Sequence, residues 1–197
     1  MIRTLITLPL LTIPLSGCLL VDYNTRSGFF TGGTLNDTAV VTDDVQQFGD
    51  VYSDEIGGVS YYTTLGNGRA EAYAGIASGS NVGPELVSGT AVYLADYEIA
   101  SISNLRYYEN ELYGVSSLDG GTILLTADLS TMTLTGARGG FEVDGTISGG
   151  TVGGNVTYGG LQGDLRGLVG QQGVIGAFHA NNGEMVYSGG FMDYVGD

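Results

Sequence analysis

The sequence contains no lysine and no tryptophan, and among its 197 residues it has one cysteine and three prolines. A single cysteine excludes a disulfide within the chain and a cysteine cluster that could hold a metal. The six basic residues are all arginine and face 21 acidic residues, so the formal net charge is −15. Such a surface repels nucleic acid and anionic lipid headgroups, and we interpret it as a means of keeping the protein dissolved.

The composition instead favours strands. Helix-forming residues are scarce, whereas threonine, valine and tyrosine are common, and the chain has 13 tyrosines and 35 glycines. The glycines follow no three-residue period, which excludes a collagen-like helix. The length suits one sizeable all-β domain with an irregular N-terminal region.

The N-terminus reads as an export signal. Arg3 precedes an apolar segment that runs from Thr4 to Leu15 and is too short to span a bilayer as a helix. Leu15-Ser16-Gly17-Cys18 follows, and these four residues resemble the bacterial lipoprotein box. The resemblance implies that residues 1–17 are a signal peptide and that Cys18 becomes lipidated. The alternative is an ordinary signal peptide with an incidental cysteine.

The residues after Cys18 predict how the protein is held in the envelope. Leu19 stands where an aspartate would favour the inner membrane, so we expect an outer-membrane lipoprotein, on either the periplasmic or the outer face. Residues 18–56 are acidic and weakly periodic, and they are predicted to form a tether. Their acids lack the spacing of a calcium loop. Residues 57–86 contain the alternation of one or two strands.

Residues 87–197 are predicted to form one β-barrel domain, because turn signals recur every 8 to 12 residues. Glycine pairs separate many of the expected strands, which are 88–99, 111–117, 122–128, 132–136, 141–147, 152–158 and 161–167. In 141–147 the apolar residues alternate with Glu142 and Asp144. Lipid would not accept these outward acids, so a membrane-spanning barrel is disfavoured.

The series ends in a hairpin whose strands are joined at Asn181-Asn182-Gly183, a strong turn signal. Val174 and Phe178 should share one face of its first strand, and Ile175 and His179 the other. Its glycines, which are Gly176, Gly189 and Gly190, are interpreted as sites of curvature.

Several of these segments, in this order, resemble the barrel module of the transferrin-binding protein B family, which related surface lipoproteins such as factor H-binding protein share. They are Ser88–Tyr93, Thr126–Gly136, Val143–Gly149, Gly154–Tyr158, Gly176–Ala180 and Tyr187–Phe191. The resemblance covers roughly residues 88–192. It implies a soluble eight-stranded antiparallel barrel with a filled interior, and a remnant of the family's handle region in 57–86. The chain has room for one barrel only, so the resemblance does not extend to transferrin binding.

No pattern in the chain predicts an enzyme, a metal site or a cofactor. His179 is the only histidine, and its place just before the turn predicts an exposed residue at a strand end. Asp128, Asp144 and Asp164 are candidates for a carboxylate pair, but they occupy positions typical of outward faces. The glycine-rich segment 151–155 lacks the lysine of a phosphate loop.

The tyrosines are the better indication of function, because tyrosine offers apolar area with a polar end. Tyr107, Tyr108, Glu109 and Asn110 lie in a predicted loop, 104–111, and are the candidate ligand-binding residues. The alternative is that the tyrosines pack on the barrel. The sequence therefore predicts a binding lipoprotein for a protein or small solute, or alternatively an accessory envelope lipoprotein that partners another outer-membrane protein.

Lipidation is directly testable. Metabolic labelling with a palmitate analogue should tag the protein, and Cys18→Ala should abolish the tag because the thiol is the attachment atom. A variant that still carried the label would contradict the predicted anchor.

Overall fold

The computed structural model describes residues 24–30 and 45–196. The predicted signal segment and Cys18 lie outside these ranges. Every regular element within them is a strand, so this part of the chain offers no helix that could cross a membrane. The all-β class is therefore confirmed.

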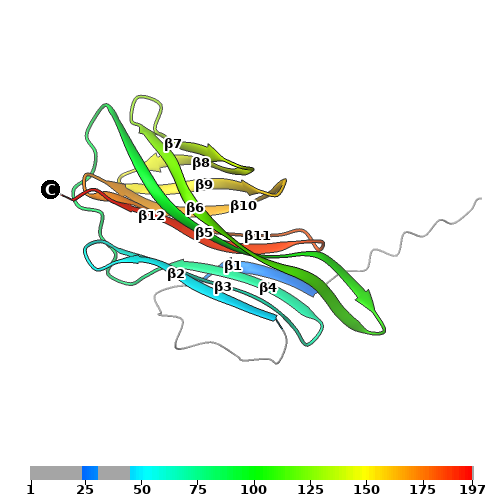
Figure 1. The fold of residues 1–197 in the computed structure, drawn as a ribbon. Coiled ribbons are helices and arrows are strands. Elements are labelled where there is room, and N and C mark those ends of the chain that lie inside the picture. Colours follow the sequence, from blue (N-terminus) through cyan, green and yellow to red (C-terminus); the bar gives the residue numbers. More distant parts are fainter. Residues whose placement is uncertain (1–23, 31–44, 197) are drawn as a thin grey trace, which may run out of the picture.

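In the described part of the chain, twelve strands form two sheets, shown in Figure 1. The N-terminal sheet consists of β1 (Asn24–Phe29), β2 (Val45–Ser53), β3 (Gly57–Gly66) and β4 (Arg69–Ile76). The barrel consists of β5 (Thr90–Tyr108), β6 (Glu111–Asp128), β7 (Thr133–Arg138), β8 (Phe141–Ser148), β9 (Thr151–Tyr158), β10 (Leu161–Gly170), β11 (Gly173–Asn181) and β12 (Val186–Tyr194).

The barrel is closed in the order β10-β11-β12-β5-β6-β7-β8-β9, and all neighbours are antiparallel. The eight strands agree with the sequence prediction. Two-residue turns connect β7 to β8, β8 to β9 and β9 to β10, and each turn is a glycine pair: 139–140, 149–150 and 159–160. All six glycines have positive φ. Such a conformation suits tight hairpins and costs glycine little.

Two of the predicted strands are one strand in the structure. The segments 111–117 and 122–128 were expected as separate strands, but they form the single strand β6, Glu111–Asp128. Gly120 and Gly121 make no turn there and stay in the ladder opposite Glu98 and Tyr97 of β5. The long partner β5 holds them extended, which a local turn signal does not reveal.

Side chains fill the barrel interior. Phe141 of β8 packs between Tyr97 and Phe178, with ring centroids 4.9 and 5.2 Å away. Val143 and Ile147 on the same strand are also buried, and Glu142, Asp144 and Thr146 are exposed, as the alternation predicted. Aromatic burial of this size dominates the energetics of a small core.

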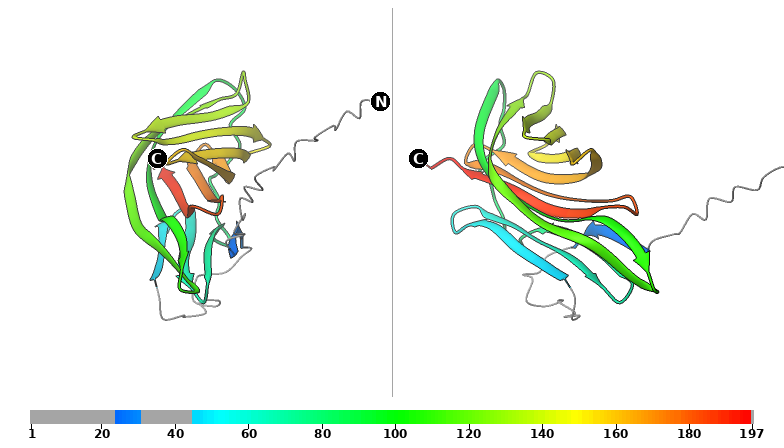
Figure 2. Two further views of the ribbon diagram at one scale, coloured as in Figure 1. Left: turned by 90° about the vertical axis from the view of Figure 1, so that its right-hand side faces the viewer. Right: turned by 45° about the vertical axis from the view of Figure 1, so that its right-hand side comes forward.

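The strands of the C-terminal hairpin are buried on both faces. Val174 and Phe178 of β11 belong to the barrel core, as predicted. Ile175 and Ala177 point the other way, into a second core against the N-terminal sheet. Figure 2 shows that sheet lying along β11 and β12, outside the barrel.

The N-terminal sheet has the order β1-β4-β3-β2, with β1 parallel to β4. β1 and β2 fall within 18–56, so the prediction of a tether was wrong for these two segments. Both are edge strands. Their polar sequences do not indicate strands, and they become strands by pairing with β4 and β3. Polar contacts join this sheet to the barrel: Tyr61 Oη donates to Glu98 Oε2 at 2.6 Å, and the Thr63 and Ser188 hydroxyls are 2.7 Å apart.

The glycines of the hairpin allow close contacts. A Cβ on Gly190 would lie 2.6 Å from Val59 of β3, and one on Gly176 would lie 2.1 Å from the Phe191 ring. A Cβ on Gly189 would lie 2.1 Å from the carbonyl oxygen of Glu98. Besides any effect on curvature, these glycines therefore leave room for neighbouring side chains and backbone to lie directly against β11 and β12.

Gly189→Val should accordingly destabilise the protein by about 1 to 3 kcal/mol, the usual cost of overpacking. Thermal unfolding followed by circular dichroism measures it. The matched control is Gly153→Ala, because a Cβ there meets no atom within 4 Å. Equal melting temperatures for the two variants would contradict the packing described for β12.

Candidate functional site

The β5–β6 hairpin projects beyond the end of the barrel (Figure 1). Its outer part keeps the antiparallel ladder, with Arg106 opposite Tyr113 and Tyr108 opposite Glu111. Glu109 and Asn110 form the two-residue turn, with φ of 50° and 69°. Two positive φ values are typical of the type I′ turn, whose twist matches that of the strands it joins. The tip is therefore an ordered hairpin, whereas the sequence predicted a loop.

A β-bulge lies at the base of this projection. The register shifts between Ser103 and Arg106, so Asn104 and Leu105 together oppose Gly114. Asn104 has a positive φ of 54°, and Leu105 N donates to Glu184 O at 3.0 Å. Leu105 is itself buried, in a cluster that also contains residues of β3, β4, β6 and β12. The bulge thus attaches the projecting arm to the barrel.

The structure brings together two of the four predicted ligand-binding residues beside two that the prediction missed. Tyr107 and Tyr108 line a shallow hollow of about 480 Å³ with Arg106 and Tyr113. The ring of Tyr108 is 63% exposed and packs edge-on against Tyr113, with centroids 6.3 Å apart. Tyr107 Oη donates to Gly68 O of the N-terminal sheet at 2.6 Å. The other two, Glu109 and Asn110, form the exposed turn.

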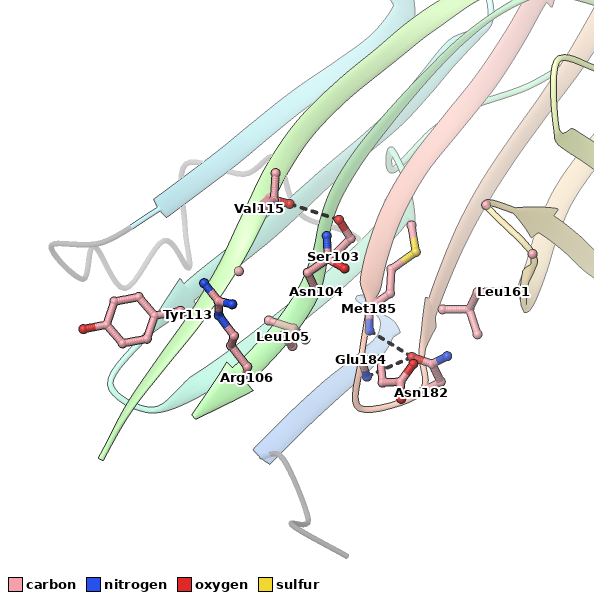
Figure 3. Close-up of a pocket in the computed structure, with 13 residues that line it drawn as sticks. Ser103, Asn104, Leu105, Arg106, Tyr113, Val115, Leu161, Asn182, Glu184 and Met185 are labelled. Atoms are coloured by element: carbon pink, nitrogen blue, oxygen red, sulfur yellow. Dashed lines mark hydrogen bonds between the residues drawn. The ribbon is translucent and has the colours of Figure 1, made fainter. Parts of the chain in front are cut away.

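A larger groove separates the hairpin from the end of the barrel (Figure 3). It has a volume of about 760 Å³. One wall comes from residues 103–106 and 113–115, and the other from the turns at 159–161 and 182–185. We call this space the groove.

The groove combines apolar and charged side chains. Val115, Leu161 and Met185 supply apolar surface, while Arg106 and Glu184 supply one charge of each sign. The far rim is held in place, because Asn182 Oδ1 accepts the backbone N–H groups of Glu184 and Met185 at 3.0 and 2.9 Å. Within residues 24–30 and 45–196, no three histidine, cysteine, aspartate or glutamate side chains gather as metal ligands.

Tyr113 was missed because the sequence predicted a loop at 104–111, so no partner opposite Tyr113 was expected. Its hydroxyl donates to Glu111 Oε2 at 2.8 Å, and this hydrogen bond is the main cause that raises its pKa. The sequence placed Tyr113 in a strand, and the two-residue turn at Glu109 and Asn110 sets the register that places it opposite Arg106. An exposed tyrosine within a short alternating strand was the one available signal.

The three candidate aspartates make no hydrogen bond to one another among the described residues. Asp128 Oδ1 accepts the N–H and hydroxyl of Ser130 at 2.8 and 2.6 Å, and these bonds lower the pKa of Asp128. Asp144 and Asp164 lie on strands separated by β9, where Asn155 stands between them in register. All are on or near the outer surface of the barrel, and Asp144 is exposed.

The prediction that His179 is exposed was wrong. Its side chain is 6% exposed, because β1 covers it, and its ring lies edge-on to Phe29 with centroids 4.3 Å apart. Nδ1 has no hydrogen-bond partner among the described residues. Burial lowers the pKa of His179, Asp164 opposes that shift and Arg166 adds to it. The residue is a neutral packing group between the barrel and the N-terminal sheet.

No family model matches the chain, and no curated protein matches it. Its fold is similar to that of several solved structures at low identity. The haemoglobin receptor HpuA from Kingella denitrificans, in its apo form, has a TM-score of 0.39 and 14% identity over 76% of this chain. Transferrin-binding protein B from Haemophilus parasuis, as a Trp-176-Ala mutant, has a TM-score of 0.47 and 14% identity over 77% of this chain. The chain spans 62% and 40% of these two structures.

Acid should destabilise the protein through His179. The unfolded histidine has a pKa near 6.5, whereas burial depresses the folded value. The stability from keeping this ring neutral is therefore complete above that pH and is lost as the pH falls below it. Melting temperatures measured from about pH 7.5 to about pH 5 should fall more for the wild type than for His179→Gln, which cannot titrate. Parallel curves would contradict the burial of this ring.

Proposed function

We propose that the chain is a binding protein of the bacterial outer membrane that presents the β5–β6 hairpin and the groove to a protein partner. The observation that carries this proposal is the exposed aromatic surface of a projecting, ordered hairpin beside an open groove. Tyr108, Tyr113 and Val115 are all exposed on this hairpin, next to Arg106. Tyrosine and arginine are the residues most enriched among those that dominate binding energy.

The filled barrel supports an external site. Tyr97, Phe141, Phe178 and Phe191 occupy the interior, so a ligand has to bind to the outer surface, the strand ends or the turns. The groove is also open along its length, which suits a segment of a protein better than an enclosed small molecule. Its walls come from distant parts of the chain that the bulge holds together.

The charge of the chain supports a partner with a basic surface. A net charge of −15 attracts cationic surfaces and raises the rate of encounter at low salt. Glu109, Glu111 and Glu184 lie at or near the hairpin and the groove, where Arg106 is the one base that lines the groove. Binding should therefore weaken as salt is added.

A lipid on Cys18 would hold this surface at the membrane, and Leu19 favours the outer one. Protease added to whole cells distinguishes a protein on the outer face of the membrane from one on the periplasmic face. Digestion of the β5–β6 hairpin would support recognition of an external partner. Complete protection would support an accessory role with another envelope protein.

The binding surface can be tested with the lipid-free chain, Cys18→Ser, immobilised and exposed to host serum and to spent culture medium. A protein retained from either source is then measured against Tyr108→Ala/Tyr113→Ala. We expect its affinity to fall at least about tenfold, because each truncation removes an exposed aromatic contact.

The control variant for this experiment is Tyr194→Ala. Tyr194 is 39% exposed at the end of β12 that pairs with Gly173, whereas the other end of β12 lies beside Ile102 at the base of the hairpin, and its loss should leave the affinity unchanged. A partner that bound the double variant as well as the wild type would show that the hairpin is not the recognition surface.

A further inference from the structure

Strand β6 has a long unpaired edge. On one side it pairs with β5 from Glu111 to Asp128, apart from the bulge. On the other side it pairs with β7 through three residues only, Thr126, Ala127 and Asp128. No described strand pairs with the second side of residues 112–121, and we call this segment the β6 edge. Figure 1 shows β6 continuing past the end of β7 into the projecting hairpin.

The backbone groups that point outward along this edge can be identified. The carbonyl oxygens of Val115 and Ser117 face β5, where they accept the hydroxyls of Ser103 and Ser101, each at 3.5 Å. The carbonyl oxygen of Thr122 faces the other side, where it accepts a hydrogen bond from Arg138 of β7.

Successive residues of a strand direct their backbone N–H and C=O groups to opposite edges. The backbone N–H and C=O groups of the even-numbered residues of β6 therefore point away from β5. Those on the β6 edge are Leu112, Gly114, Ser116, Leu118 and Gly120.

Proteins usually protect such an edge with lysine, proline, a bulge or a covering segment. The β6 edge contains no lysine and no proline, and its bulge lies on β5. The Arg138 guanidinium reaches Thr122 just beyond it. Within the edge, Leu118 is 60% exposed, and Tyr113 and Val115 are also exposed. An exposed apolar strand with unused backbone donors and acceptors is a ready template for another strand.

We propose that the β6 edge receives an extended segment of the protein partner as an added strand. This proposal rests on the binding function proposed above and specifies how the same hairpin recognises its partner. Backbone hydrogen bonds to the even-numbered residues supply affinity, and side chains at alternate positions supply specificity.

The surroundings define the chemistry of the segment. Side chains on one face of the added segment meet Tyr113, Val115 and Asp119. Apolar residues and a lysine or arginine are therefore favoured at those positions of the segment. The other face meets Leu118. A second copy of this chain is a poor occupant, because it would bring a further net charge of −15 to the same surface. The occupant is therefore an extended, basic and partly apolar segment of a different protein.

The probe for this mode is a displayed library of peptides of about ten residues, in which apolar positions alternate with lysine, arginine or threonine. It is selected on the lipid-free full chain, and a selected peptide is synthesised with a fluorescent label. Ser116→Pro removes one outward N–H without removing a hydrogen bond to β5, and proline is tolerated at such edge positions. Ser116→Thr is the matched control, because it keeps the N–H.

Strand addition predicts at least about tenfold weaker binding to Ser116→Pro and unchanged binding to Ser116→Thr. A peptide methylated at alternate backbone nitrogens should lose affinity for the wild type by a similar factor, whether or not the proline variant folds. Hydrogen exchange should slow at the amides of Ser116, Leu118 and Gly120 when peptide binds. Equal binding to both variants, or a selection without such a peptide, would overturn the proposal.

The serum or medium partner separates this proposal from the one on which it rests. If that partner loses affinity for Tyr108→Ala/Tyr113→Ala but not for Ser116→Pro, the hairpin binds through side chains and strand addition is wrong. If neither change affects it, the hairpin is not the binding surface at all.

Discussion

Burial of β11 and β12 on both faces is the constraint on which the rest of the structure depends. One face of this hairpin completes the barrel core through Phe178, Tyr187 and Phe191. The other face packs against the N-terminal sheet through Ile175 and Ala177. Two cores thus share one pair of strands, and the glycines of these strands let both cores come close. Removal of apolar surface from water on both sides is the main stabilising contribution here.

The parts of the fold that could be predicted are those encoded by neighbouring residues. Alternation in β8 and paired glycines at the turns are local signals, and both agreed with the structure. β1, β2 and the burial of His179 could not be predicted in this way. β1 and His179 depend on strands from distant parts of the chain, which are β4 and β1 respectively. β2 pairs with the strand that follows it, β3, but its own sequence is only weakly periodic.

The candidate site shows the same division. The tyrosine content indicated Tyr107 and Tyr108, and the structure places both beside Arg106 and Tyr113 in one hollow. Arg106 and Tyr113 join them because the turn at Glu109 and Asn110 sets these two residues opposite each other. The opposite wall of the groove comes from turns near Leu161 and Met185. No local pattern relates residues so far apart in the chain.

The order of these contacts along the chain determines when the domain can be completed. Ser27 accepts a hydrogen bond from Asn181, 154 residues later, and Thr63 meets Ser188, 125 residues later. The first strand to leave the ribosome therefore waits for nearly the last. Loop-closure entropy opposes such distant contacts until most of the chain is present, which slows folding. The contacts between the N-terminal sheet and the barrel consequently cannot be completed until the final hairpin has been synthesised.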